Sequence, residues 1–217
     1  PPVFRQVGGD GAAAGPGRQG RGWARGPATT EVESHVLDWL VDLLGLPTGW
    51  KTTDQGGGVI QMSASDSTHT ALVVARRLAR TRGPIEHLVA YTSAQAHSSI
   101  EKGARVAGFE HIRLIDVDDT FAMSVDALEA AIDDDLTSGL VPAFVCSAVG
   151  TTGTTAVDPV RRIGEAAQRH GMWHHVDAAY AGSAMLCEEF RHHQDGLELA
   201  DSYTFNPHKW MFTNFDC

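Results

Sequence analysis

The clearest sequence signal for the fold lies at residues 141–180, VPAFVCSAVGTTGTTAVDPVRRIGEAAQRHGMWHHVDAAY. It begins with an apolar run at residues 141–149, which reads as a buried strand. Asp158-Pro159 then opens a helix that Gly171 ends, because proline suits the first helical turn and glycine suits the position after the last. A second apolar run follows at residues 173–176. A strand, a helix and a strand at this spacing predict two parallel strands in one sheet.

The same alternation extends over most of the chain. Further helices are expected at residues 30–44, 65–82, 97–106 and 124–136, and further strands at residues 87–91, 112–117 and 202–205. In the first of these helices, Thr30 and Glu33 have the spacing of a capping box, so we expect them to close its N-terminus. The pattern as a whole predicts an α/β fold with a mainly parallel sheet flanked by helices.

The first 28 residues differ in composition from the rest. They contain eight of the 23 glycines and four of the nine prolines, with almost no apolar periodicity. We expect residues 1–28 to be a loop or disordered arm and residues 29–217 to be one domain.

Composition narrows the class of partner. The formal net charge of -10 opposes nucleic acid or an anionic membrane as the main partner, so a small-molecule substrate fits better. No apolar run is long enough for a membrane helix and no signal peptide opens the chain, so we expect a cytoplasmic protein. Three widely spaced cysteines offer neither a disulfide framework nor a Cys-x-x-Cys metal site.

In a parallel sheet, ligands bind at the carboxyl ends of the strands. The segments that follow predicted strands here are rich in polar groups, at residues 93–97, 150–152, 177–180 and 206–209. We therefore expect these four segments to build the functional site.

Two of these segments carry groups suited to one cofactor. Lys209 is one of only three lysines and follows a short strand among aromatic residues, where a lysine of lowered pKa could form a Schiff base with an aldehyde. Asp177 ends a strand, where a carboxylate could keep a pyridinium nitrogen protonated. Taken singly, Lys209 could instead cover a helix start and Asp177 could be an N-cap.

Weaker signals come from serine and histidine residues. The Ser63-Ala64-Ser65 turn precedes a helix, where backbone N–H groups favour an anion, although a serine N-cap explains it equally well. His97 could stack on a flat cofactor or be a surface histidine. A metal site at His174-His175 is disfavoured because neighbouring strand residues point to opposite faces.

Several motifs in this order resemble the pyridoxal-phosphate-dependent group II amino-acid decarboxylases, and most of all the aromatic-L-amino-acid decarboxylases. The segments that carry the resemblance, within residues 23–217, are HVDAAYAG at 175–182, NPHKW at 206–210, TNFDC at 213–217, GGGVIQMSAS at 56–65, QAHSS at 95–99 and GTTG at 150–153. The resemblance implies the large domain of a fold-type-I pyridoxal-phosphate enzyme over residues 29–217, a homodimer, and pyridoxal 5'-phosphate as cofactor. It also implies decarboxylation of an L-amino acid, most simply an aromatic one, to an amine and carbon dioxide.

The resemblance further implies catalytic roles for Lys209, which would form the Schiff base, and for Asp177, which would pair with the ring nitrogen. His97 would stack on one face of the ring and Ala179 would pack on the other. Thr152 would contact the cofactor near its ring oxygen.

The phosphate group would be held by other residues. The resemblance places Ala64 and Ser65 there, assisted by Asn206. Ser202 and His208 would lie behind these groups or beside the phosphate.

Three alternatives remain open. The same scaffold could decarboxylate an acidic or diamino acid, or form an aldehyde. The chain could also be a truncated, non-catalytic cofactor-binding protein, and a metal-dependent hydrolase is a more distant alternative. Because family members are longer, we expect these residues to be the cofactor-binding core of a decarboxylase, either as a partial sequence or as a truncated product.

Overall fold

The computed structural model describes residues 26–213, which fall into two compact units. Within that range, the first unit contains residues 26–63, 183–191 and 206–213, and the second contains residues 64–182 and 192–205. Most of the expected N-terminal arm, residues 1–25, lies outside the described residues. The α-helices are α2 (Pro27–Leu43), α3 (Ala64–Ala79), α4 (Ser99–Ala107), α5 (Val125–Thr137), α6 (Val160–His170) and α7 (Pro207–Trp210). The strands are β1 (Leu88–Ser93), β2 (His111–Ile115), β3 (Val141–Ala148), β4 (Trp173–Asp177) and β5 (Ser202–Thr204).

The second unit is built on a five-stranded sheet in the order β2-β1-β3-β4-β5. Every neighbouring pair of strands is parallel, so the predicted α/β fold is confirmed. The stretch at residues 141–180 forms the expected β3–α6–β4 unit, with Gly171 in the left-handed conformation after α6. Because all strands run the same way, their carboxyl ends meet at one edge.

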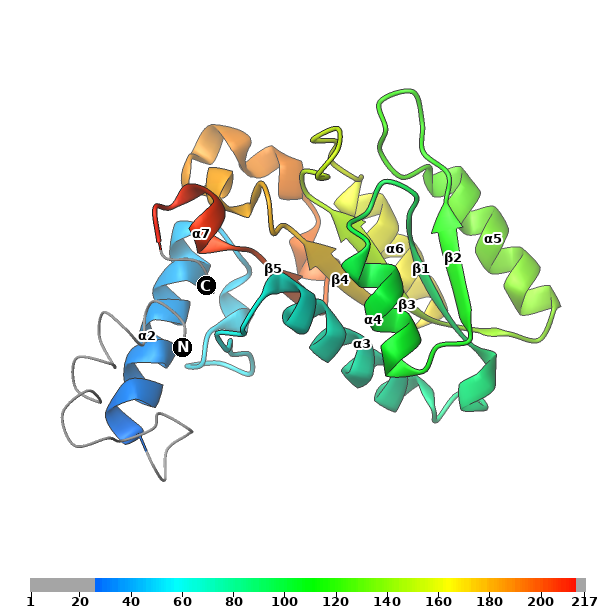
Figure 1. Cartoon of the computed structure of the whole chain (residues 1–217), viewed down its shortest axis with the longest axis horizontal. Coiled ribbons are helices and arrows are strands. Elements are labelled where there is room, and N and C mark those ends of the chain that lie inside the picture. Colours follow the sequence, from blue (N-terminus) through cyan, green and yellow to red (C-terminus); the bar gives the residue numbers. More distant parts are fainter. Residues whose placement is uncertain (1–25, 214–217) are drawn as a thin grey trace. The chain divides into compact units, whose positions relative to one another are not determined.

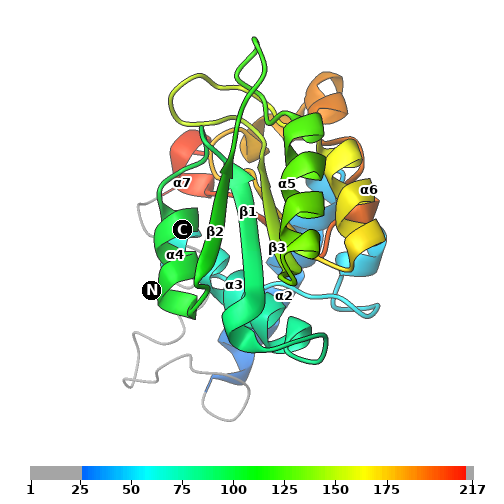
Figure 2. The same cartoon turned by 90° about the vertical axis from the view of Figure 1, so that its right-hand side faces the viewer.

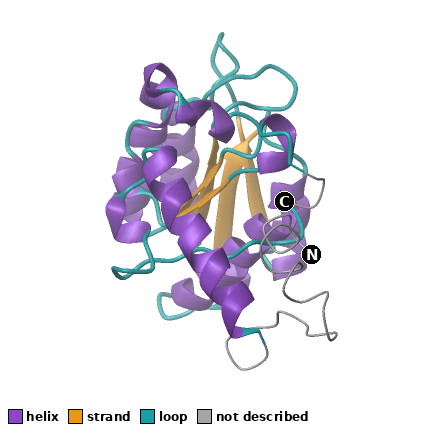
Figure 3. Cartoon of the chain, turned by 90° about the vertical axis from the view of Figure 1, so that its left-hand side faces the viewer, coloured by secondary structure: helices purple, strands orange, loops and turns teal. Residues whose placement is uncertain are grey.

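Helices cover both faces of this sheet (Figures 1 and 2). α3 and α4 pack on one face and α5 and α6 on the other, so the strands lie between two helical layers (Figure 3). Fully buried side chains such as Leu72 and Phe144 fill the first interface, and Tyr91 and Leu128 fill the second. Burying an apolar side chain of this size stabilises the fold by roughly 1.5–3 kcal/mol. Both faces of the strands are therefore apolar, as the continuous apolar runs predict.

The first unit corrects one expectation. α2 begins at Pro27 and not at Thr30, so Thr30 lies within the first turn, where its hydroxyl donates to Gly26 O at 3.1 Å. Glu33 does not close a capping box, because its Oε1 accepts the backbone N–H of Ile60 at 2.8 Å. The other predicted helices and strands are present, with ends that differ by a few residues. No described helix combines the length and the apolar character needed to cross a bilayer.

Candidate active site

Asp177 lies at the carboxyl end of β4, the strand between β3 and β5. It pairs with Ala148 on β3 and with Thr204 on β5, and its side chain is half-buried. Its Oδ1 accepts the backbone N–H of Ala179 at 3.0 Å, so the carboxylate also caps the turn that follows β4. This turn places the buried Ala179 directly beside Asp177, and the expected roles of both residues toward a cofactor stay predictions.

Thr152 lies in a loop that follows β3, the strand next to β4. Thr151 and Gly150 both donate their backbone N–H to Ala156 O, and the Thr151 hydroxyl bonds to Thr154 at 2.7 Å. Thr151 is buried by these contacts, whereas Thr152 at the turn is exposed. The fold therefore presents Thr152 to solvent at the edge that carries Asp177.

Asp158 closes the base of this loop. Its side chain is 2% exposed, and its two oxygens accept the backbone N–H groups of Met123 and Ala148, each at 2.7 Å. Burial raises the pKa of this carboxyl to about 6, while the two backbone donors oppose the shift. One carboxylate thus ties the end of β3 to the segment that precedes α5.

Glycine is required where this loop leaves β3. Gly150 has a φ of 85°, and a Cβ there would lie 2.7 Å from the Cβ of Ala181. The loop after β3 and the turn after β4 therefore approach more closely than any side chain allows.

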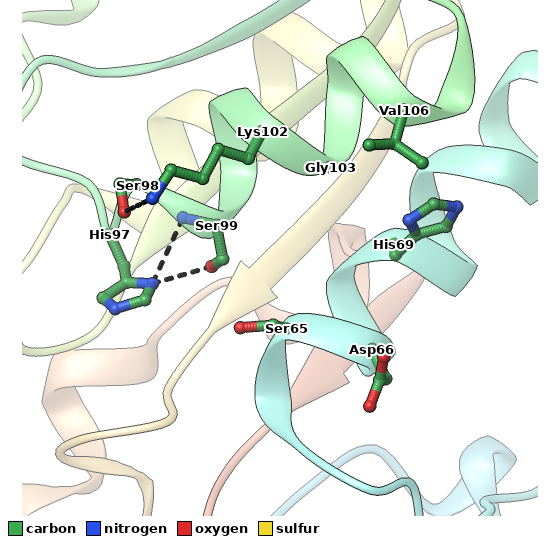
Figure 4. A pocket seen from close by; sticks show the side chains of 9 residues that line it. All are labelled: Ser65, Asp66, His69, His97, Ser98, Ser99, Lys102, Gly103 and Val106. Atoms are coloured by element: carbon green, nitrogen blue, oxygen red, sulfur yellow. Dashed lines mark hydrogen bonds between the residues drawn. The ribbon is translucent and has the colours of Figure 1, made fainter.

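Ser65 and His97 line one cavity, of about 290 Å³, between α3 and α4, which extends along α4 as far as Val106 (Figure 4). Both side chains are exposed, and Ala64, beside Ser65, is the first residue of α3. A helix N-terminus directs backbone N–H groups outward and favours an anion. Ser98, Ser99 and Lys102 on α4 complete one wall of the cavity, where Lys102 Nζ donates to Ser98 Oγ at 3.3 Å.

His97 precedes α4 and does not belong to it, which corrects the expected helix start. The backbone N–H of Ser99 donates to His97 Nδ1 at 3.2 Å, and the Ser99 hydroxyl lies 2.8 Å from the same nitrogen (Figure 4). The imidazole thus serves as an acceptor for the first residue of the helix, whose N–H has no partner within the helix.

His174 and His175 point to opposite faces of β4, as strand geometry predicts. His174 bonds to Ser147 at 2.8 Å and His175 bonds to Ser202 at 2.8 Å. Burial lowers the pKa of His174 to about 4 and that of His175 to about 3, so both rings are neutral at pH 7. Within residues 26–213, no three His, Cys, Asp or Glu side chains gather in a way that could hold a metal ion.

Ser202 begins β5 and lies below the site edge. It pairs with His175, two residue pairs further from the edge than Asp177, and its Oγ also accepts the indole N–H of Trp173 at 2.8 Å. Both expected roles of Ser202, behind the cofactor-binding groups or beside the phosphate, stay predictions.

Lys209 belongs to α7 of the first unit, with Asn206 at the N-cap position. Its side chain is exposed, and its backbone N–H donates to Asn206 O at 3.2 Å. Asn206 is 7% exposed and His208 is half-buried. These residues follow β5 directly in the chain.

The polar groups along the sheet edge of the second unit fit a flat, phosphorylated heteroaromatic cofactor. A half-buried carboxylate suits a ring nitrogen, an exposed imidazole suits an aromatic face, and the start of a long helix with an adjacent serine hydroxyl suits a phosphate. Together with the all-parallel sheet, these residues define an α/β cofactor-binding unit with its site at the carboxyl ends of the strands.

Comparison with known proteins gives the family. The model of the pyridoxal-dependent decarboxylase conserved domain matches residues 9–217, and the chain belongs to this family. The match begins earlier in the chain than the motifs that we matched from Trp23 onward.

Among individual relatives, phenylacetaldehyde synthase of Arabidopsis thaliana is 46% identical over 212 residues, which cover 94% of this chain and 43% of that protein. Tryptophan decarboxylase 2 of Oryza sativa is 46% identical over 205 residues, covering 91% of this chain and 41% of that protein. The crystal structure of Oryza sativa TDC with PLP and tryptamine superposes with a TM-score of 0.92 at 41% identity, over 99% of this chain and 46% of that one. The chain thus spans less than half the length of the relatives that it matches.

Residue patterns alone did not indicate that Asp158 holds the loop after β3 or that Ser99 bonds to His97. Asp158 was predicted only as a helix start, and nothing in its neighbourhood along the chain indicates that it accepts the N–H of Met123. A signal did exist for His175, because strand alternation places it on the same face as Asp177.

Proposed function

We propose that the protein is a pyridoxal 5'-phosphate-dependent carboxy-lyase that converts an aromatic L-amino acid into its amine and carbon dioxide. The observation that carries this proposal is the half-buried carboxylate of Asp177 at the strand edge of a chain that belongs to the pyridoxal-dependent decarboxylases. The aromatic substrate is favoured by the tryptophan decarboxylase of rice, 46% identical. Bound pyridoxal phosphate would supply an electron sink for the bond that breaks at the α-carbon.

Each residue of the proposed site would have its own role. Lys209 would supply the amine that holds the cofactor covalently, and the negative charge of Asp177 would keep the ring nitrogen protonated. His97 and Ala179 would hold the two faces of the ring, and Thr152 would hold the side that carries the ring oxygen.

The phosphate would bind at the N-terminal turn of α3. Ala64 and Ser65 direct donors to it, and Asn206 assists. Ser202 and His208 support this end of the site. We also propose that residues 29–217 form the cofactor-binding large domain, that the protein works as a homodimer, and that it acts in the cytoplasm, where thiols such as the buried Cys146 stay reduced.

The experiment is a titration of the protein with pyridoxal phosphate, followed by borohydride reduction and peptide mass analysis. We expect a visible absorption band, a reduced cofactor on the peptide that contains Lys209, and neither in Lys209→Ala. Lys51→Ala is the matched control, because the Lys51 ammonium pairs with Asp42 at 2.6 Å and has no role in the proposed site, so this variant should keep both the band and the labelled Lys209 peptide. A band that survives in Lys209→Ala would contradict the proposal.

Formation of an aldehyde is a second candidate function, because the phenylacetaldehyde synthase of Arabidopsis thaliana is also 46% identical. Assays of carbon dioxide, amine and aldehyde over a panel of aromatic, acidic and diamino acids separate the alternatives. Carbon dioxide with a stoichiometric amine supports the decarboxylase. Cofactor binding without any product supports the non-catalytic alternative.

A further inference from the structure

His175 is a buried imidazole for which the proposed reaction has no use. It is 1% exposed, and its pKa is lowered to about 3, mainly by burial and further by His174. A neutral ring in the interior needs partners for both nitrogens, because an unsatisfied buried polar atom is costly. His175 has a partner on each side.

The first partner lies on β5 and the second on α3. Ser202 Oγ lies 2.8 Å from His175 Nδ1, and Thr68 Oγ1 lies 3.4 Å from Nε2. Thr68 is itself 1% exposed, so water does not compete for this contact. The imidazole therefore joins α3, β4 and β5 inside the second unit.

The contact between Thr68 and His175 lies close to the candidate cofactor site on both α3 and β4. Thr68 is four residues after Ala64, so the two lie on the same face of α3, one turn apart. His175 is two residues before Asp177, so their side chains leave the same face of β4. The contact between Thr68 and His175 therefore spans the gap between the start of α3 and the end of β4.

We propose that His175 is a positioning residue that sets the distance between the phosphate-binding turn at Ala64–Ser65 and the carboxylate of Asp177. The inference rests on the proposed function, and it follows from the shape of the cofactor. Pyridoxal phosphate is a rigid ring whose nitrogen and phosphate group must be held at the same time, so the two sites gain from a fixed separation. Phe144, stacked on the His175 ring at a centroid distance of 6.2 Å, helps to hold the imidazole in place.

The test compares variants that differ in which partner of His175 they keep. Asparagine can reach Ser202 but is too short for Thr68, whereas the longer glutamine can reach Thr68. Thr68→Val removes the hydroxyl and keeps the shape of the side chain. Thr70→Val is the matched control, because Thr70 is an exposed threonine of the same helix that bonds only to the carbonyl of Asp66 at 2.9 Å.

The measured quantity is the ratio of the dissociation constants of pyridoxal and pyridoxal phosphate. Both compounds present the same ring and aldehyde, but only pyridoxal phosphate also engages α3, so the ratio isolates the coupling between the two ends of the site. We expect the ratio to fall about fivefold in His175→Asn and Thr68→Val, the effect of one neutral hydrogen bond. His175→Gln and Thr70→Val should stay within about twofold of the parent protein. Thermal unfolding without ligand identifies any variant that fails to fold, and Thr68→Val keeps the test valid if His175→Asn does.

The failures can be told apart. If the parent protein binds no pyridoxal phosphate, the proposed function and this inference both fail. If it binds the cofactor but both affinities fall in parallel, or no ratio changes, His175 has only a structural role and the positioning inference alone is overturned.

Discussion

Replacing Asp158 with alanine tests how the loop that carries Thr152 is held. The carboxylate accepts two buried N–H groups, from Met123 and Ala148, and alanine leaves both without an acceptor. Each unsatisfied donor costs about 1–3 kcal/mol, so the loss of both is about 4 kcal/mol at the middle of that range. The ionisation of Asp158 reduces this loss by an amount that depends on pH.

Burial raises the pKa of Asp158 to about 6, from 3.8 in the unfolded chain. Between these values the folded protein binds more protons than the unfolded chain, so the stability contributed by this carboxyl is fully present below pH 3.8 and is lost as pH rises through 6. The cost of the buried charge is about 1.6 kcal/mol at pH 5 and about 3 kcal/mol at pH 7.5. Alanine removes this cost, so Asp158→Ala should lower the free energy of unfolding by about 2.5 kcal/mol at pH 5 but only by about 1 kcal/mol at pH 7.5.

Urea unfolding followed by circular dichroism at both pH values measures this difference. Asp126→Ala is the control, because the Asp126 side chain is 92% exposed and should change the free energy of unfolding by less than about 0.5 kcal/mol at either pH. An equal loss at both pH values, or a larger loss at pH 7.5, would refute the reasoning.

Two further predictions concern the second unit. Gly150→Ala combines a left-handed φ of 85° with a Cβ contact of 2.7 Å to Ala181, so we expect it to lower the free energy of unfolding by about 3 kcal/mol. Gly139 has a similar φ of 76°, but a Cβ there meets nothing within 4 Å, so Gly139→Ala should lower the free energy of unfolding in urea by only about 1 kcal/mol. Equal losses in the two variants would exclude the close approach of the loop after β3 and the turn after β4. Ser124→Ala removes the acceptor for the N–H of Ala127 at the start of α5 and should cost about 1 kcal/mol in the same assay, with glycine at this position costing less than alanine.

Much of the fold could be predicted because its signals are local. The apolar runs, Pro159 directly before α6 and the glycines after α4 and α6 each act over a few residues, and the helices begin and end near them. The position of Asp177 at a strand end followed from the same patterns. The rule that ligands gather at the carboxyl edge of a parallel sheet selected His97, whereas Ser65 came from a separate helix-start signal, and the cavity that both line is a finding of the structure.

The predictions that were wrong or missing concern contacts that local sequence patterns do not specify. Glu33 fits the capping-box spacing, but Ile60, 27 residues away, offers its N–H instead. The pattern predicts that the helix begins at His97, but the His97 ring accepts the N–H of Ser99 and α4 begins at Ser99, two residues later than expected. The contact between Thr68 and His175 joins residues 107 positions apart, and no local pattern specifies such a pair.

The hydrogen bond from Ser99 to His97 also determines the tautomer of the imidazole. Because a backbone N–H donates to Nδ1, that nitrogen must present its lone pair, and the proton of the neutral ring must reside on Nε2. The other tautomer would set two protons against each other at the start of α4. A ligand stacked on the neutral His97 ring would therefore meet a single N–H donor, at Nε2. The first turn of α4 determines which nitrogen carries that proton, because Ser99 donates to the other one.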